Sequence, residues 1–215
     1  MNIGIFCSAN DNIDRNYFEM TAELGRWCAR NGHSIVFGGC NMGLMGCIAE
    51  AFKSASRAEK DKVEGERMEG DKVEGERVED ERVKGGQVIG IVPRIIECGG
   101  RTSEHLTVHI PCDNLSDRKD LLLAHSDIVV ALPGGIGTLD ELFTVAAAHT
   151  IGYHHKPVVL YNMCGFWDSL IALLDDLQQR CMIRGHWTDY FLVANTLEEL
   201  AAIVERGNDC SISAL

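Results

Sequence analysis

Residues 127–141 read DIVVALPGGIGTLDE: an apolar segment, a glycine-rich turn and then a segment with a helical pattern. The apolar run predicts a buried strand over 127–132 that ends at Pro133. The segment after the glycines predicts a helix over 138–150. A buried strand that turns directly into a helix is the repeating unit of parallel α/β sheets, so this stretch predicts an α/β fold.

The same alternation of strand and helix runs along most of the chain. Strands that are apolar on both faces and are joined by helices form parallel sheets covered on both sides. We therefore predict a Rossmann-like, doubly wound parallel sheet with helices on both faces, in a single domain over residues 1–215. Strands are expected at 2–6, 34–37, 87–92, 106–110, 127–132, 157–161 and 191–194. Helices are expected at 17–31, 44–54, 118–125, 138–150, 166–179 and 197–204.

A charged, repetitive insertion at residues 57–86 interrupts this alternation. Five-residue units (DKVEG, ERMEG, DKVEG, ERVED, ERVKG) follow one another over 61–85. A period of five residues fits neither a strand nor a helix, so no continuous apolar face forms. We predict a solvated surface insertion that is mobile or only weakly helical; a partner-binding arm is the alternative.

The composition excludes several classes of protein. A net charge of −12 disfavours general nucleic-acid binding, although a locally positive site can still hold a small phosphate ligand. The chain starts without the basic and apolar regions of a secretory leader, and no stretch approaches the roughly 20 apolar residues that span a membrane. Its nine cysteines are scattered and include no C-x-x-C pair. We therefore expect a cytoplasmic protein with reduced thiols, no metal site and no association with membranes.

Four loops that follow predicted strands carry small, glycine or polar residues. In doubly wound sheets, ligands bind outside the carboxyl ends of the strands, so these loops should meet along one edge. They are residues 7–10, 38–43, 112–117 and 133–137.

The loop at 133–137 is a candidate phosphate cradle. Gly134, Gly135 and Gly137 let the backbone approach a ligand closely, and a helix N-terminus favours anions. The segment lacks both the P-loop pattern and the dinucleotide fingerprint. Thr138 and Glu141 have the spacing of a capping box, so a purely structural role for Glu141 is the alternative to a catalytic one.

Arg118 and Lys119 form the second candidate signal, at the start of the helix expected over 118–125. Cations in the first helical turn oppose the helix dipole, and they are better explained if an anion binds there. An ordinary solvated pair is the alternative. Because the following strand runs back along this helix, Arg118 should lie near the 133–137 turn. A cation pair, a phosphate cradle and a carboxylate would then converge on one site.

Two further loops offer weaker candidates. Gly39 and Met42 lie in a second glycine-rich turn that would hold a flat base, although a tight turn explains the glycines equally well. Ser8 offers a small polar group after the first strand. Its neighbour Cys7 has no histidine placed as a base, which argues against a nucleophilic cysteine.

Taken together, these motifs resemble the Lonely Guy family of cytokinin riboside 5′-monophosphate phosphoribohydrolases, which are often labelled lysine decarboxylases. The resemblance covers nearly the whole chain from Ile3 to Val204, apart from the repeat. It is carried by Gly38–Gly46, by Arg118-Lys119 and by the motif P-G-G-x-G-T-x-x-E at Pro133–Glu141.

The resemblance implies a homodimer that uses no cofactor. It also implies that Arg118 and Glu141 are essential for catalysis, that Lys119 is a second basic residue that binds the substrate, and that Gly134, Gly135, Gly137 and Thr138 bind phosphate. The chain departs from the family pattern at Leu115, where the family has methionine, at Ser8-Ala9-Asn10 and at Cys40-Asn41. Because these changes surround the expected base pocket, adenine and N6-modified adenine both remain open as the preferred base.

The predicted function is therefore hydrolysis of the N-glycosidic bond of a purine-type nucleoside 5′-monophosphate, cytokinin-like or adenosine, to free base and ribose 5-phosphate. Glu141 would stabilise the positive charge that develops on the ribose or would orient the attacking water. Arg118 would anchor the phosphate or the ribose. A non-catalytic molybdenum-cofactor carrier on the same scaffold is the main alternative. A pyridoxal-dependent lysine decarboxylase is the weaker one, because no Schiff-base lysine motif is evident.

Overall fold

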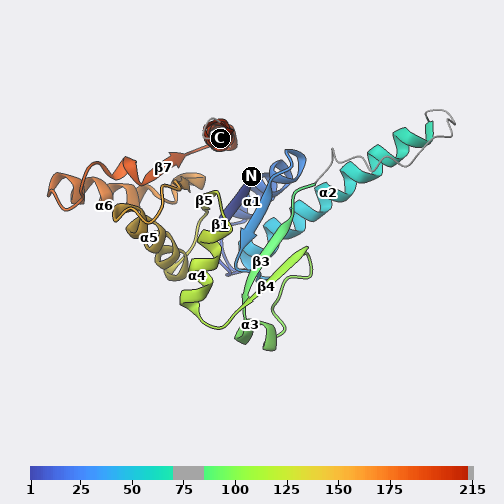
Figure 1. Cartoon of the computed structure of the whole chain (residues 1–215), viewed down its shortest axis with the longest axis horizontal. Helices are drawn as coiled ribbons and strands as arrows, with labels where there is room; N and C mark the ends of the chain where they lie inside the picture. Colours follow the sequence, from blue (N-terminus) through green and yellow to red (C-terminus); the bar gives the residue numbers. More distant parts are fainter. Residues whose placement is uncertain (70–84, 213–215) are drawn as a thin grey trace.

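The computed structural model describes residues 1–69 and 85–212 and contains one seven-stranded parallel sheet (Figure 1). The strand order is β4-β3-β2-β1-β5-β6-β7, and every neighbouring pair is parallel. The strands are β1 (Asn2–Phe6), β2 (Ser34–Phe37), β3 (Val88–Pro93), β4 (Val108–Cys112), β5 (Ile128–Ala131), β6 (Val158–Tyr161) and β7 (Phe191–Ala194). The helices are α1 (Arg15–Arg30), α2 (Gly43–Glu69), α3 (Arg94–Cys98), α4 (Leu115–Ala124), α5 (Ile136–Thr150), α6 (Asp168–Gln179) and α7 (Leu197–Ile212), with short 3-10 turns η1 (Met163–Gly165) and η2 (Trp187–Asp189).

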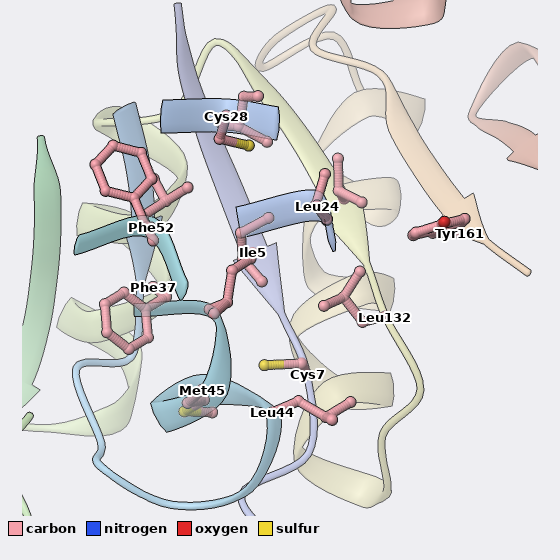
Figure 2. Packing of buried hydrophobic residues seen from close by; sticks show 14 of the residues in the cluster. Ile5, Cys7, Leu24, Cys28, Phe37, Leu44, Met45, Phe52, Leu132 and Tyr161 are labelled. Carbon is pink, nitrogen blue, oxygen red and sulfur yellow. The ribbon is translucent and has the colours of Figure 1, made fainter. Parts of the chain in front are cut away.

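Helices cover both faces of the sheet, which confirms the predicted doubly wound α/β architecture. One buried cluster joins the sheet to α1, α2 and α7 through residues such as Leu24, Ile48 and Leu200. Figure 2 shows part of this cluster. A second cluster joins the other face to α4, α5 and α6 through residues such as Leu122 and Val145. The strand order reverses direction between β1 and β5, where such sheets open a crevice for ligands.

The helix expected over 44–54 is longer than predicted, because α2 continues through Glu69 into the first repeat units. In Figure 1 its later part projects away from the sheet. Repeat residues 61–69 are thus helical, and the predicted weakness of that helix stays a prediction. Glutamate, lysine and arginine have good intrinsic helix propensity, and a helix already formed adds residues more easily than it starts. Repeat residues 70–84 lie outside the described residues.

The end of β4 and the segment after β3 also differ from expectation. The strand was expected to end before Pro111, yet Pro111 lies inside β4 and pairs with Val92. A proline is tolerated there because β4 is the edge strand and its second side needs no N–H donor. The five-residue helix α3 was not predicted, because one turn and a half is too short to show a periodic pattern.

Helices α4 and α5 both begin earlier than predicted. Asn114 caps α4 by accepting hydrogen bonds from the N–H groups of Ser116 and Asp117. Arg118 therefore follows three helical residues, where a cation opposes the helix dipole less than it would at the helix start. Helix α5 begins at Ile136 after the capping residue Gly135, which makes no side-chain capping bond. Thr138 and Glu141 are thus interior helical residues, and the capping-box explanation of Glu141 is wrong.

Three of the four loops expected to meet at the carboxyl ends of the strands are joined by hydrogen bonds. The N–H of Ser8 donates to the Pro133 carbonyl oxygen at 3.0 Å, and the Leu44 N–H donates to the Ser8 carbonyl oxygen at 2.9 Å. The loops after β1, β2 and β5 are thereby joined into one edge. Among the described helices, none is long and apolar enough to span a membrane.

Candidate active site

A buried ion pair between Arg118 and Glu141 forms the centre of the site. Arg118 projects from α4 and Glu141 from the second turn of α5, and Nη1 lies 3.3 Å from Oε1. Only 17% of the Arg118 side chain and 7% of the Glu141 side chain are exposed. The two residues that the sequence singled out from separate motifs are therefore in direct contact.

The Glu141 carboxyl group carries opposing electrostatic influences. Burial raises its pKa above the ordinary value, and the charge of Asp140 adds to this, whereas Arg118 and Lys119 lower it. Burial is the largest influence, so the net direction is upward. A carboxylate removed from water but paired with a guanidinium can stabilise a nearby positive charge more strongly than one in solvent.

The guanidinium of Arg118 still has a donor to offer. Among the described residues, its buried Nε–H has no hydrogen-bond partner. Its Nη2 lies against Gly38, at the end of β2, where a β-carbon would overlap it. A buried donor without a partner costs free energy, so it is commonly kept for a ligand.

The glycines at the start of α5 differ in whether packing requires them. A β-carbon on Gly134 would overlap the Thr138 side chain, which is itself buried, so this glycine is required by packing. Gly135 and Gly137 face open space, since an added β-carbon would meet no atom within 4 Å. The helix start therefore presents open backbone at its positive end, which suits a phosphate group.

A cavity of about 350 Å³ adjoins the ion pair. Arg118 belongs to both features, because it lines this cavity and contacts Glu141. The walls are mostly apolar but carry two arginines, so we call it the arginine cavity. Its lining residues are Ala9, Gly38, Cys40, Met42, Met45, Pro93, Ile96, Arg101 and Arg118.

The other residues singled out from sequence take mixed positions. Met42 lines the arginine cavity as expected. Gly39 is buried in a tight turn with a φ of 69°, packed against Val92, which favours its structural explanation. The Ser8 hydroxyl accepts the Asn10 N–H at 3.0 Å, and Leu115 is 66% exposed at the first residue of α4. Binding roles for Gly39, Ser8 and Leu115 stay predictions.

Lys119 lies beside the ion pair but is engaged elsewhere. Its Nζ donates to both carboxylate oxygens of Asp140 and to the Thr144 hydroxyl, each at 3.1 Å. These bonds tie α4 to α5. Lys119 could reach a substrate phosphate only by exchanging these partners, so its binding role also stays a prediction.

Cys7 is buried next to the site, within the cluster drawn in Figure 2. Burial, followed by the neighbouring Glu141 carboxylate, raises the pKa of its thiol well above the ordinary value. The thiol therefore stays protonated and is a poor nucleophile. Across the described residues there is also no group of three or more histidine, cysteine, aspartate or glutamate residues that could hold a metal ion.

Sequence reasoning missed two residues of the site, Gly38 and Arg101. Gly38 was read only as part of a turn, whereas its missing side chain makes room for Arg118. Arg101 follows the unpredicted helix α3 and carries no motif. Its place on the cavity wall depends on how its loop pairs with Gly39–Asn41, which no local pattern reveals.

Comparison with known proteins identifies the family. The model of the family described as "possible lysine decarboxylase" matches residues 76–204, more than half of the chain. The chain belongs to this family, the Lonely Guy family. A family relative, cytokinin riboside 5′-monophosphate phosphoribohydrolase LOG4 from Arabidopsis thaliana, is 26% identical over 208 residues, which are 97% of this chain and 83% of the relative. The probable phosphoribohydrolase LOGL9 of Oryza sativa subsp. japonica is 31% identical over 171 residues, 80% of this chain and 63% of the relative.

Solved structures share the fold of this Lonely Guy family member. The molybdenum cofactor carrier protein from Chlamydomonas reinhardtii superposes with a TM-score of 0.64 at 21% identity, covering 97% of this chain and 98% of the carrier. The TM1055 structure superposes with a TM-score of 0.62 at 23% identity, covering 95% of this chain and 98% of TM1055. Both likenesses concern the fold alone.

Proposed function

We propose that the protein hydrolyses the N-glycosidic bond of a purine-type nucleoside 5′-monophosphate, cytokinin-like or adenosine, to free base and ribose 5-phosphate. The observation that carries this proposal is the buried contact of 3.3 Å between Arg118 and Glu141, beside an open helix N-terminus. The named activity of relatives such as LOG4 supports it.

The order of the three features matches the order of groups in a nucleotide. The 5′-phosphate binds at Gly135, Gly137 and the start of α5, where backbone is open. The ribose then lies at Arg118 and Glu141, and the base enters the arginine cavity. A volume of about 350 Å³ is adequate for a purine, and the apolar walls suit its flat faces.

In this arrangement Glu141 acts on the carbon atom whose bond breaks. Cleavage leaves positive charge on the ribose, which a buried carboxylate stabilises, while the same group orients the attacking water. Arg118 lowers the pKa of Glu141 against the larger effect of burial, and its free Nε–H binds the phosphate or the ribose. Because a guanidinium stays protonated at ordinary pH, Arg118 anchors and does not transfer protons.

The test is to incubate the purified protein with AMP and with isopentenyladenosine monophosphate, and to measure free base by chromatography. Glu141→Gln is the matched control, since it keeps the size and an acceptor for Arg118 but removes the charge. Base release by the wild type, lost in a folded Glu141→Gln, supports the hydrolase. Nucleotide binding without base release from either protein would instead support a carrier, the function named for the structural neighbour in Chlamydomonas reinhardtii.

We also propose that the protein is a homodimer, and the exposed face of α5 supports this. Ile136 is 86% exposed and Phe143 is 40% exposed, and both border a shallow hollow on that helix. Apolar side chains gathered on one exposed helix face are typical of an interface. Light scattering should give twice the mass of one chain for the wild type and a lower mass for Ile136→Glu; a wild-type monomer would exclude the dimer.

A further inference from the structure

Helix α3 forms one side of the arginine cavity but buries none of its own side chains. Ile96 of α3 lines the cavity, as does Pro93 immediately before the helix. None of the five residues of α3 is buried, and Ile95 is 77% exposed. A helix of this length is unstable by itself, so α3 keeps its place only through its neighbours.

Two polar side-chain contacts at the surface connect α3 to β4 and to the residue after it. Arg94 Nε lies 2.6 Å from Asp113 Oδ1, and Glu97 Oε1 lies 2.8 Å from His109 Nε2. The second contact is an ion pair only when His109 is protonated. The side chains of Arg94 and Asp113 are 69% and 73% exposed, and such exposed pairs contribute little to stability. The attachment of α3 can therefore be broken at a low cost in free energy.

The chain is fixed on both sides of α3. Before the helix, Pro93 is the last residue of β3 and pairs with Cys112 of β4. After the helix, the Asn41 N–H donates to the Arg101 carbonyl oxygen at 2.9 Å. Gly100 lies between α3 and this second anchor, with a φ of 64° and no atom within 4 Å of an added β-carbon. A short, weakly attached segment between two anchors, with a glycine at one end, is the arrangement of a hinged loop.

We propose that α3 is a lid of the arginine cavity, which closes on the base of a bound nucleotide and opens to release it. This inference rests on the hydrolysis proposed above and on the position of the base in the arginine cavity. A base in the cavity gives Ile96 a flat apolar surface to pack against, and this contact stabilises the closed position. The phosphate binds instead at the start of α5, so a ligand without a base should leave α3 open.

Hydrogen exchange measured by mass spectrometry tests whether the base closes α3. The amides of Gly100 and Arg101 donate to carbonyl oxygens of α3, so they report on its opening. Glu141→Gln, which should keep nucleotides intact, is compared without ligand and with AMP, isopentenyladenosine monophosphate or ribose 5-phosphate. A nucleotide that binds should slow the exchange of these two amides about 10-fold, whereas ribose 5-phosphate should change it less than about twofold.

A second test removes the contacts that hold the closed lid, with affinities measured by calorimetry. Arg94→Met loses the ion pair with Asp113 and should weaken nucleotide binding about two- to fivefold. Ile96→Ala removes the contact with the base and should weaken nucleotide binding about 10-fold. Neither variant should change the affinity for ribose 5-phosphate. Arg180→Met is the matched control, because Arg180 is also 69% exposed and forms an ion pair of 2.8 Å with Asp176 at the end of α6, which does not line the cavity.

The outcomes separate the lid from the proposed function. Equal protection by nucleotide and by ribose 5-phosphate, or no protection at nucleotide concentrations that saturate binding, overturns the lid while hydrolysis stands. Equal losses of nucleotide affinity in Arg94→Met and Arg180→Met also overturn it. If the wild type cleaves no nucleotide, the hydrolase fails, and the same exchange experiment on the wild type still decides whether α3 closes on a base. A protein that binds neither AMP nor isopentenyladenosine monophosphate overturns both.

Discussion

The guanidinium of Arg118 lies against the α-carbon of Gly38, in the space that a β-carbon would fill. Three consequences follow from one missing side chain: Arg118 can reach Glu141, line the arginine cavity and remain mostly buried. Gly38 belongs to the glycine-rich motif Gly38–Gly46, but its contact with Arg118 is a consequence of how α4 packs against the end of β2.

Gly38→Ala should therefore reduce activity without unfolding the protein. The overlapping atom is the movable end of a long side chain, so Arg118 can shift and break its contact with Glu141. A displacement of about 1 Å at a catalytic group can cost about 100-fold in rate, so we expect kcat/KM to fall by about that factor. Thermal unfolding should stay close to that of Gly85→Ala, a control whose β-carbon would meet no atom within 4 Å. Full activity in Gly38→Ala would contradict the required position of Arg118.

Gly137→Ala should weaken substrate binding while leaving the fold intact. Its β-carbon would enter the open space at the start of α5 and occupy part of the phosphate site. Alanine is a better helix former than glycine by about 1 kcal/mol, so unfolding should require slightly more denaturant. Steady-state kinetics should show a KM raised about 10-fold, the equivalent of one charge-assisted hydrogen bond of about 1.4 kcal/mol. An unchanged KM would exclude phosphate binding at this turn.

Gly134→Ala, three residues away, should instead destabilise the fold. Its β-carbon would overlap Thr138, a buried residue of α5 that has little room to move. We expect a loss of stability of about 1–3 kcal/mol from overpacking, measured by chemical denaturation. Stability equal to that of Gly137→Ala would show that both glycines serve the ligand.

Titration of Glu141 should make both the activity and the stability of the protein depend on pH in the acidic range. Burial raises its pKa above the ordinary value of 4.5, so kcat should fall as pH decreases through this raised value. The free energy of unfolding has the opposite pH dependence to kcat, because the folded protein binds the Glu141 proton more tightly than the unfolded chain does. The stabilisation from the raised pKa of Glu141 is fully present below pH 4.5. It is lost as pH rises through the pKa that Glu141 has in the folded protein. The difference in melting temperature between wild type and Glu141→Gln should therefore shrink or reverse as pH rises; a constant difference would mean that burial does not raise this pKa.

Asp140→Asn tests whether Lys119 serves the substrate. Lys119 donates to both carboxylate oxygens of Asp140, which is 58% exposed, so losing the pair should cost less than about 1 kcal/mol of stability. A lysine released from this partner can turn to a bound phosphate, so KM should decrease if Lys119 has the predicted binding role. Lys119→Met provides the comparison and should raise KM. If neither change alters KM, Lys119 only ties α4 to α5.

Much of the architecture could be predicted from the sequence, because burial and periodicity act locally. The apolar runs that became β5 and β6 and the glycine turn after β5 predicted the parallel sheet, and all seven strands were expected. Errors occurred where local pattern competes with context. Pro111 is accepted only because β4 is an edge, and α2 continues past its buried part because its later residues are strong helix formers.

For the candidate site, too, some features could be predicted from the sequence and others depended on the tertiary structure. The sequence by itself determined which residue types are present at the carboxyl edge of the sheet, because strand order along the chain fixes which loops emerge there. Only the tertiary structure decided that Glu141 faces Arg118 instead of capping α5, that Lys119 turns to Asp140, and that Arg101 lines a cavity with Met42. Those facts depend on the helix starts and on contacts between residues far apart in sequence. The contacts are set by packing between distant residues, which no local pattern of residues encodes.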